Sequence, residues 1–236
     1  MVKPVVTAEH GVVREEEAMT NTLSGRPSPV RTVGFAWLAL SALAIAVFAP
    51  LRYFLNSLPD LAATGEEIAG HYVVRPAWAQ TALLLHAGGG GLALLLSPVQ
   101  LSARVRARIP RVHRVVGRIA LLAIAVGGVA GLVLSTVSLA GPMGTAGFGT
   151  LAVAWLTCAA LGLRAILRGD VAAHRRWMLR TFALTYAGVT LRLWLIVLIP
   201  LLGDDFLRAY LFTPFLCWVP NLVIAELLLR RTQTAI

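Results

Sequence analysis

Six apolar runs, separated by short polar segments, occupy the chain from residue 33 onward. Each run is close to the length of about 20 residues that a helix needs to cross a hydrocarbon core of roughly 30 Å. The pattern therefore predicts an all-α integral membrane protein, a bundle of six transmembrane helices that forms one domain over residues 33–231. The runs cover residues 33–51, 78–99, 115–140, 149–167, 177–200 and 209–229.

The segment before the first run, residues 1–32, is polar. It holds three consecutive glutamates and the proline- and serine-bearing stretch SGRPSPVR. Such a composition buries little apolar surface, so we expect a flexible cytoplasmic segment. The sequence allows translation to start at Met1 or at Met19.

Composition and charge agree with a membrane protein, since 58% of the 236 residues are hydrophobic and only 14% are charged. The net charge of +10 would suggest a nucleic-acid partner for a soluble protein. Here all but four of the 21 Lys and Arg lie in or next to inner segments if both termini are cytoplasmic. Cytoplasmic loops carry such an excess. We therefore predict an N-in, C-in, multi-pass protein of the cell inner (cytoplasmic) membrane, with the lipid bilayer and no nucleic acid as its partner.

Several small residues within the runs are expected to serve packing. Cys158 and Cys217 fall inside apolar runs, where no loop disulfide can form, so we interpret them as small core residues. Gly127 and Gly131 have the small-xxx-small spacing that lets membrane helices approach closely.

The longest outer loop, residues 52–77, contains the stretch LPDLAATGEEIAGHY. Its apolar residues predict a short helix at the membrane surface. His71 lies within it and is expected to be solvated.

Two ionisable residues lie deep within the predicted spans, where such groups are costly and usually face the bundle interior. By a rise of 1.5 Å per residue, His86 and Arg192 each lie roughly 12 Å from the outer ends of their spans. We therefore expect them to share a level and to line a pocket in the outer half. The pocket residues predicted from the sequence are His86, Arg192, Gln100, Asn221 and Glu226.

A second layer is expected near the inner ends of the spans. Glu226 is the only carboxylate within the six runs, and pairing with Arg118 or Arg180 is the least costly way to keep its charge. Gln100 lies at the same edge. His113 and His174 are expected just before the third and fifth spans.

The segments that carry these two histidines resemble each other. HRVVGR covers 113–118 and HRRWMLR covers 174–180. In each, a His-Arg pair is followed by another arginine at the inner start of a span that follows a hairpin. The likeness indicates an internal repeat of helix hairpins.

At three places the sequence resembles a family of bacterial predicted membrane proteins, the family of domain of unknown function 2306. The stretches are LHAGGGGLALLLSPVQ (85–100), HRVVGR (113–118) and HRRWMLRTFALTYAGVTLR (174–192). The resemblance implies a helical protein with several membrane spans, and it implies no activity. The signature residues that it implies here are His86, Gln100, His113, Arg114, Gly117, Arg118, His174, Trp177, Met178, Arg180 and Arg192.

The first functional hypothesis is a membrane redox protein that binds b-type haem. Haem iron is commonly held by two neutral imidazoles from neighbouring helices at one depth. His113 and His174 are therefore the expected axial ligands of the haem iron. No other metal is predicted for them. Nearby arginines suit the propionates, and the cofactor-binding residues predicted are His113, His174, Arg114, Arg118, Arg175 and Arg180. Six-span cytochromes with four histidines and two haems offer an analogy. His86 lacks a histidine partner at its depth, which disfavours a second haem.

Two alternatives stay open at this point. One is a membrane-embedded enzyme or carrier for a small lipophilic or anionic molecule, with His86 and Arg192 in its pocket. A terpene cyclase would be one version, with Glu226 as its acid. The other is a structural membrane protein without a cofactor. In either case Trp177 is expected to be an interfacial anchor and Met178 a packing residue.

Overall fold

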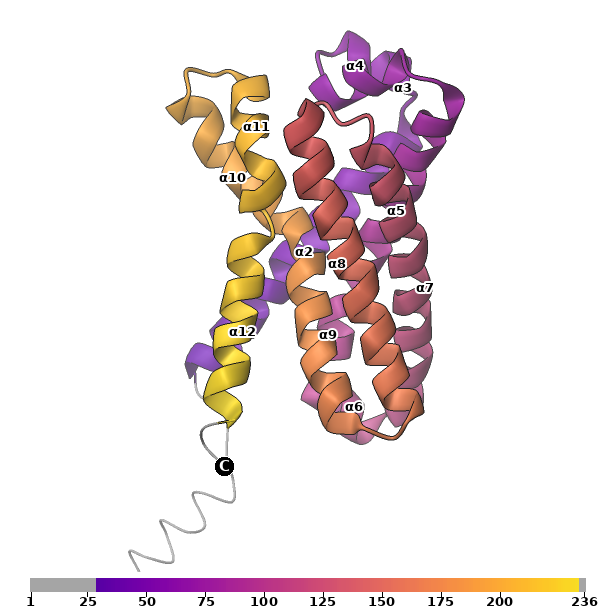
Figure 1. Ribbon diagram of the computed structural model, residues 1–236, viewed down its shortest axis with the longest axis vertical. Helices are drawn as coiled ribbons and strands as arrows, with labels where there is room; N and C mark the ends of the chain where they lie inside the picture. Colours follow the sequence, from indigo (N-terminus) through magenta and orange to yellow (C-terminus); the bar gives the residue numbers. More distant parts are fainter. Residues whose placement is uncertain (1–28, 234–236) are drawn as a thin grey trace, which may run out of the picture. The chain divides into compact units, whose positions relative to one another are not determined.

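The computed structural model describes residues 29–233, and their regular structure is helical (Figure 1). Within these residues six stretches are long and apolar enough to cross a membrane. They are Thr32–Leu55, Ala77–Leu101, Pro110–Ser135, Gly141–Leu167, Val171–Leu201 and Phe206–Arg231. The prediction of an all-α protein with six transmembrane stretches is therefore confirmed.

The chain divides into two compact units, one that ends at Trp37 and one from Leu38 to Ile236. The first helix, α2 (Pro29–Leu55), begins in the first unit and continues into the second. The segment predicted to be flexible, 1–32, falls outside the described residues up to residue 28, and so do both candidate start sites. From Pro29 onward the chain is helical.

The third and fourth spans differ from the predicted boundaries. α5 (Ala77–Leu101) agrees closely, but α7 (Pro110–Ser135) and α8 (Gly141–Leu167) both begin earlier than their apolar runs. Pro110 and Pro142 each lie in the first turn of a helix, where a missing N–H costs nothing. The third apolar run also overshoots its helix, since α7 ends at Ser135 and the run at residue 140. Hydropathy therefore detects the apolar core of a span and leaves the first and last turns of its helix undefined.

Four helices form a closed bundle: α5, α7, α8 and α9 (Val171–Thr185). Each packs on the next along the chain, and α9 returns to α5, so α7 and α9 lie at opposite corners. At the core, Ala93, Ile124 and Leu184 surround Trp155. The Trp155 Nε1 donates to Thr185 Oγ1 at 2.8 Å, which satisfies its buried donor.

Glycines set the closeness of the α5 and α7 pair. A Cβ atom added at Gly89 would lie 2.7 Å from the backbone nitrogen of Gly127, so the two backbones touch there. One turn further along α7, a Cβ at Gly131 would lie 2.8 Å from Nδ1 of His86. The expectation that Gly127 and Gly131 serve close packing is confirmed. Cys158 and Cys217 are buried and free, as their interpretation as core residues requires.

Both C-terminal spans are interrupted near their middle. In one, α9 gives way to α10 (Ala187–Leu201) at Tyr186. In the other, α11 (Phe206–Leu216) gives way to α12 (Val219–Gln233) after Cys217. Side chains bridge the two breaks, since Thr190 Oγ1 donates to Cys217 O at 2.5 Å and Asn221 Nδ2 donates to Ala183 O at 3.2 Å. These bonds supply partners for carbonyls that the interrupted helices leave without one.

The outer loop forms two short helices where one was predicted. They are α3 (Leu58–Ala63) and α4 (Glu67–Val73). Leu61 and Tyr72 are buried in a cluster that also includes Ala79 of α5 and Leu134 of α7, so the loop packs on the bundle.

The prediction that His71 is solvated is wrong. Its side chain is half-buried, and its Nε2 donates to Val137 O at 2.8 Å. The ring also meets Tyr72 edge to face, with 4.9 Å between the ring centroids. His71 therefore holds α4 to the loop after α7.

Candidate functional site

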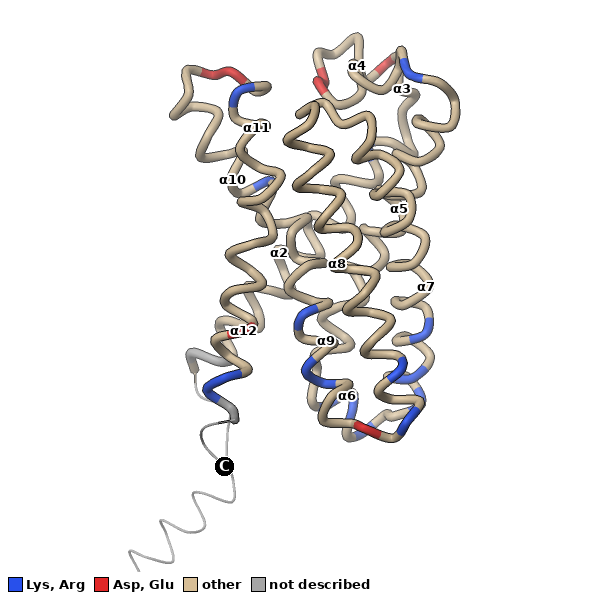
Figure 2. Tube along the Cα trace, viewed as in Figure 1, with Lys and Arg blue, Asp and Glu red and all other residues tan. Residues whose placement is uncertain are grey.

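Basic residues gather at one end of the four-helix bundle. Figure 2 shows them on α6 (Ala103–Arg108), on the first turns of α7 and α9 and on the last turn of α8. Acidic residues lie mostly at the other end, around α3, α4 and the turn between α10 and α11. We call the first of these the basic end.

Asp170 positions the start of α9 at this end. Gly169 adopts a φ of +78°, which reverses the chain after α8. Asp170 Oδ1 then accepts a hydrogen bond of 2.8 Å from the backbone N–H of Ala173. A carboxylate at a helix N-terminus also offsets the unfavourable placing of Arg175 and Arg176 there.

His174 lies in the first turn of α9. Its Nδ1 is 2.8 Å from the carbonyl oxygen of Gly162 on α8, and because a carbonyl can only accept, Nδ1 carries the proton. A neutral ring then has Nε2 as its acceptor. Met178 lies one turn later and also packs on Gly162, where an added Cβ would be 2.2 Å from its methyl carbon. The expected packing role of Met178 is confirmed.

His113 lies in the first turn of α7, because that helix begins at Pro110 and not at residue 115 as predicted. Within the described part of the chain, its buried Nδ1 has no hydrogen-bond partner. Its ring is within electrostatic range of His174 and of Arg106. Gln100 Nε2 donates to the His113 carbonyl at 3.1 Å.

Each of the four helices thus contributes one residue to a single layer at the basic end. We call Gln100, His113, Gly162 and His174 the histidine layer. The two imidazoles come from opposite corners of the bundle, and the other two residues bond to them or to their backbone.

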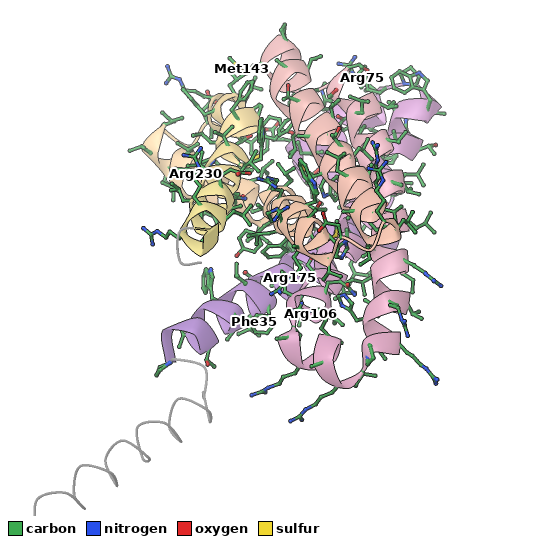
Figure 3. All side chains as sticks on the ribbon, turned by 60° about the horizontal axis from the view of Figure 1, so that its bottom comes forward. Phe35, Arg75, Arg106, Met143, Arg175 and Arg230 are labelled. Atoms are coloured by element: carbon green, nitrogen blue, oxygen red, sulfur yellow. The ribbon has the colours of Figure 1, made fainter. Side chains whose placement is uncertain are left out.

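The arginines around this layer differ in their surroundings. Arg106 donates to the Gln100 carbonyl at 3.4 Å, so it borders the layer. Arg114, Arg118 and Arg175 are exposed. In Figure 3, where the basic end comes forward, Arg106 and Arg175 both lie on this end.

Arg180 is engaged in an ion pair with Glu226. Its Nε and Nη2 donate to the two carboxylate oxygens at 2.5 and 2.9 Å, and its guanidinium lies 4.7 Å from the Trp177 ring centroid. Of the two partners proposed for Glu226, Arg180 is therefore the one found. A carboxylate in such a pair is a poor proton donor, which disfavours the terpene-cyclase version. Trp177 packs against the main core cluster, so its role is more than that of an interfacial anchor.

His86 and Arg192 do lie near each other, as helix rise predicts. Arg192 is within electrostatic range of His86. Each side chain, however, bonds to a backbone carbonyl and not to the other. His86 Nδ1 donates to Gly127 O at 2.8 Å, and Arg192 Nη1 donates to Gly188 O at 2.5 Å.

The other residues predicted for this pocket lie apart from it. Gln100 belongs to the histidine layer, 14 positions along α5 from His86, or about 21 Å by helix rise. Asn221 bridges the two helix breaks. Glu226 holds Arg180.

Four contributors to these sites were not found from the sequence. Arg106 is one of several arginines in a predicted cytoplasmic loop, and its sequence context does not distinguish it from the others. Gly162 acts through its backbone carbonyl, which every residue has, so its role cannot be predicted from the sequence. Tyr53 and Tyr210, near the ends of their spans, lie within electrostatic range of Arg192. Their span-end positions are typical of interfacial tyrosines, so nothing separated them from that role.

One family model matches the chain. Its description reads predicted membrane protein (DUF2306), and the match covers residues 83–229, more than half of the chain. The chain belongs to this family. The resemblance predicted from three motifs is thus confirmed, and the DUF2306 region includes the whole histidine layer together with Arg180 and Glu226. Comparison with curated proteins and with solved structures found no match.

Proposed function

We propose that this DUF2306 protein is a membrane redox protein that holds b-type haem between His113 and His174. The observation that carries the proposal is that two imidazoles from opposite corners of the four-helix bundle lie within electrostatic range of each other at the basic end. A haem held there would supply one-electron transfer.

His174 has the arrangement that an axial ligand needs. Haem-ligating histidines usually donate one ring N–H to a carbonyl or carboxylate, which fixes the ring and frees the other nitrogen. The bond from His174 Nδ1 to Gly162 O does this and leaves Nε2 for a ligand. Met178 closes the space behind Gly162 and so restricts rotation of α9 against α8.

His113 supports a ligand at the same level in a different way. A buried polar atom without a partner costs about 1–3 kcal/mol, so such atoms are rare unless a ligand satisfies them. The Nδ1 of His113 is such an atom. The bond from Gln100 to its carbonyl holds the first turn of α7 in place.

Arginines near the layer suit the two carboxylates of a haem. Arg106 is the best placed of them, because it borders the layer and lies within electrostatic range of His113. Arg114, Arg118 and Arg175 are exposed at the same end. Arg180 is occupied by Glu226 and contributes less than the sequence suggested.

The proposal places the basic end in the cytoplasm and the protein in the inner membrane, with both termini inside. The asymmetry of charge between the two ends supports this orientation. The haem site would then lie near the cytoplasmic face, where arginines beside anionic headgroups and soluble electron donors are both within reach.

The test is the absorption spectrum of the full chain, expressed with ample haem and purified in detergent. A Soret band is expected, and His113→Ala and His174→Ala should each remove it or change it to a five-coordinate spectrum. His86→Ala is the matched control, because His86 is about 21 Å along α5 from the layer, and it should keep the band. A colourless wild-type preparation, or bands unchanged in both layer variants, contradicts the proposal.

A second candidate function is an enzyme or carrier for a small lipophilic or anionic molecule. The observation that favours it is the group of polar side chains within electrostatic range of Arg192, one of which, His86, lies 14 positions along α5 from Gln100 of the histidine layer. The two functions are separable, since they use different residues.

A further inference from the structure

Arg192 is a charged side chain at membrane depth whose charge no residue of the described chain balances. It lies on α10, half-buried, and its Nη1 donates to the carbonyl of Gly188 in its own helix. Within residues 29–233 no carboxylate is within ion-pair distance of it. A guanidinium inside a bilayer normally pairs with an anion or lines a route for one. Arg192 therefore lacks an anionic partner among the residues that the structure describes.

Three other helices place polar side chains near this guanidinium. Tyr53 of α2, Tyr210 of α11 and His86 of α5 all lie within electrostatic range of Arg192. The Tyr53 hydroxyl donates to Glu66 at 3.2 Å, which holds it in place near the outer loop. The guanidinium and the Tyr210 phenol both donate hydrogen bonds, a combination that suits an oxyanion.

His86 adds an accessible ring to the same cluster. His86, Ala93 and Gln100 are seven residues apart and so share one face of α5. Ala93 is buried in the core with 2% of its surface exposed, whereas His86 is exposed. Since Nδ1 of His86 donates to Gly127, Nε2 is the nitrogen free to meet a ligand.

The surface around this depth is apolar. Phe54 of α2, Leu85 of α5 and Phe212 of α11 are 56%, 49% and 54% exposed. A molecule that reaches Arg192 through the bilayer must therefore combine an anionic headgroup with an apolar tail.

We propose that Arg192, together with His86 and Tyr210, binds the oxyanion headgroup of an amphiphile, a carboxylate or phosphate on an apolar chain. The guanidinium supplies the opposite charge and the Tyr210 phenol donates a hydrogen bond, while the Tyr53 hydroxyl stays bonded to Glu66 beside them. His86 Nε2 accepts from the acid when the headgroup arrives protonated. The site is independent of haem.

Binding is measured by native mass spectrometry of the full chain after delipidation, with four probes. They are oleate, its uncharged methyl ester, dodecyl phosphate and acetate. Oleate or dodecyl phosphate should bind at one site, and whichever is tighter identifies the headgroup. Methyl oleate and acetate should bind at least about 10-fold more weakly, because each lacks the charge or the tail.

Variants of Arg192 distinguish binding that depends on its charge from nonspecific adsorption of the apolar tail. Arg192→Gln should weaken binding of the charged probe by about 10- to 100-fold, and Arg192→Lys should retain part of it. Arg208→Gln, which removes an exposed arginine of α11, is the matched control and should bind normally. If Arg192→Gln fails to fold, Tyr210→Phe, which removes the phenol donor, should still weaken binding by about fivefold or more.

Three outcomes would overturn the proposal. One is equal binding of oleate and methyl oleate, and another is normal binding by a folded Arg192→Gln variant. The third is the absence of binding of either charged amphiphile to wild-type protein. None of these results depends on a Soret band, so failure here and failure of the haem proposal are distinguishable.

Discussion

Asn221 is expected to hold the two interrupted spans together, and its replacement by leucine tests this role. Its side-chain nitrogen lies 3.2 Å from Ala183 O, 2.9 Å from Thr190 Oγ1 and 3.1 Å from Cys217 O. The Ala183 carbonyl is left without a helical partner by the break at Tyr186. Leucine has the same branched side-chain skeleton as asparagine, with methyl groups in place of the amide oxygen and nitrogen, so Asn221→Leu removes the hydrogen bonds and keeps the branching of the side chain.

The magnitude follows from which acceptors lose their partner. The amide has two hydrogens, so it makes about two full bonds, each worth about 0.6 kcal/mol in a membrane protein. Cys217 O keeps its bond from Thr190, but Ala183 O becomes unsatisfied, which costs about 1 kcal/mol or more. We therefore expect Asn221→Leu to lower the free energy of unfolding by about 2 kcal/mol.

The assay is reversible unfolding by sodium dodecyl sulfate in mixed micelles, followed by circular dichroism. Asn56→Leu is the matched control, because Asn56 is exposed and bonds only to Arg52 O at 3.0 Å; it should change the free energy by less than about 0.5 kcal/mol. In a double-mutant cycle, Thr190→Val and Asn221→Leu should couple by about 0.5–1.7 kcal/mol. Additive effects, or a loss below about 0.5 kcal/mol for Asn221→Leu, would refute the reasoning.

Three further predictions concern packing, charge and pH. Gly89→Ala should destabilise the bundle by about 2 kcal/mol or more, because the new Cβ would meet the α7 backbone at 2.7 Å. Gly90→Ala, with nothing within 4 Å of its added Cβ, should be neutral or slightly stabilising in the same unfolding assay. Glu226→Leu should cost about 1–3 kcal/mol since the Arg180 and Glu226 side chains are only 21% and 37% exposed, and adding Arg180→Met should recover part of that loss. Burial raises the pKa of Tyr72 from 10.0 to about 12, so ionisation favours the unfolded chain, and stability should fall between pH 10 and pH 12 by up to about 3 kcal/mol. The fall should be smaller in Tyr72→Phe, and an equal fall in that variant would argue against this assignment.

The helical class and the six spans could be predicted from the sequence, because burial in lipid imposes a simple rule on composition. A helix must present about 20 apolar residues to the hydrocarbon core, and that requirement is visible in any single run. The close contact at Gly127 was visible for a related reason, since only small residues permit it. The boundaries near Pro110 and Pro142 were less visible, because the helices extend into polar turns.

The pairing of side chains between helices depended on the tertiary structure. The sequence left Glu226 with two equally good partners, and only the placing of α12 beside α9 selects Arg180. It also grouped Asn221 with His86, because the depth of a residue in a span can be predicted from the sequence and its direction around the bundle cannot. His71 was misjudged for the same reason, since its partner is a backbone carbonyl 66 positions away.

The sequence by itself determined that this chain is a helical membrane protein and that its basic residues lie at one end of the spans, and it predicted that His113 and His174 lie at that end. Those properties follow from local composition and helix rise, which any segment carries alone. The tertiary structure decided which corners of the bundle the two histidines occupy, which arginine is neutralised and which stands without a counter-charge, and how the broken helices satisfy their carbonyls. These are contacts between segments far apart in the chain, and they form only when the helices pack against one another.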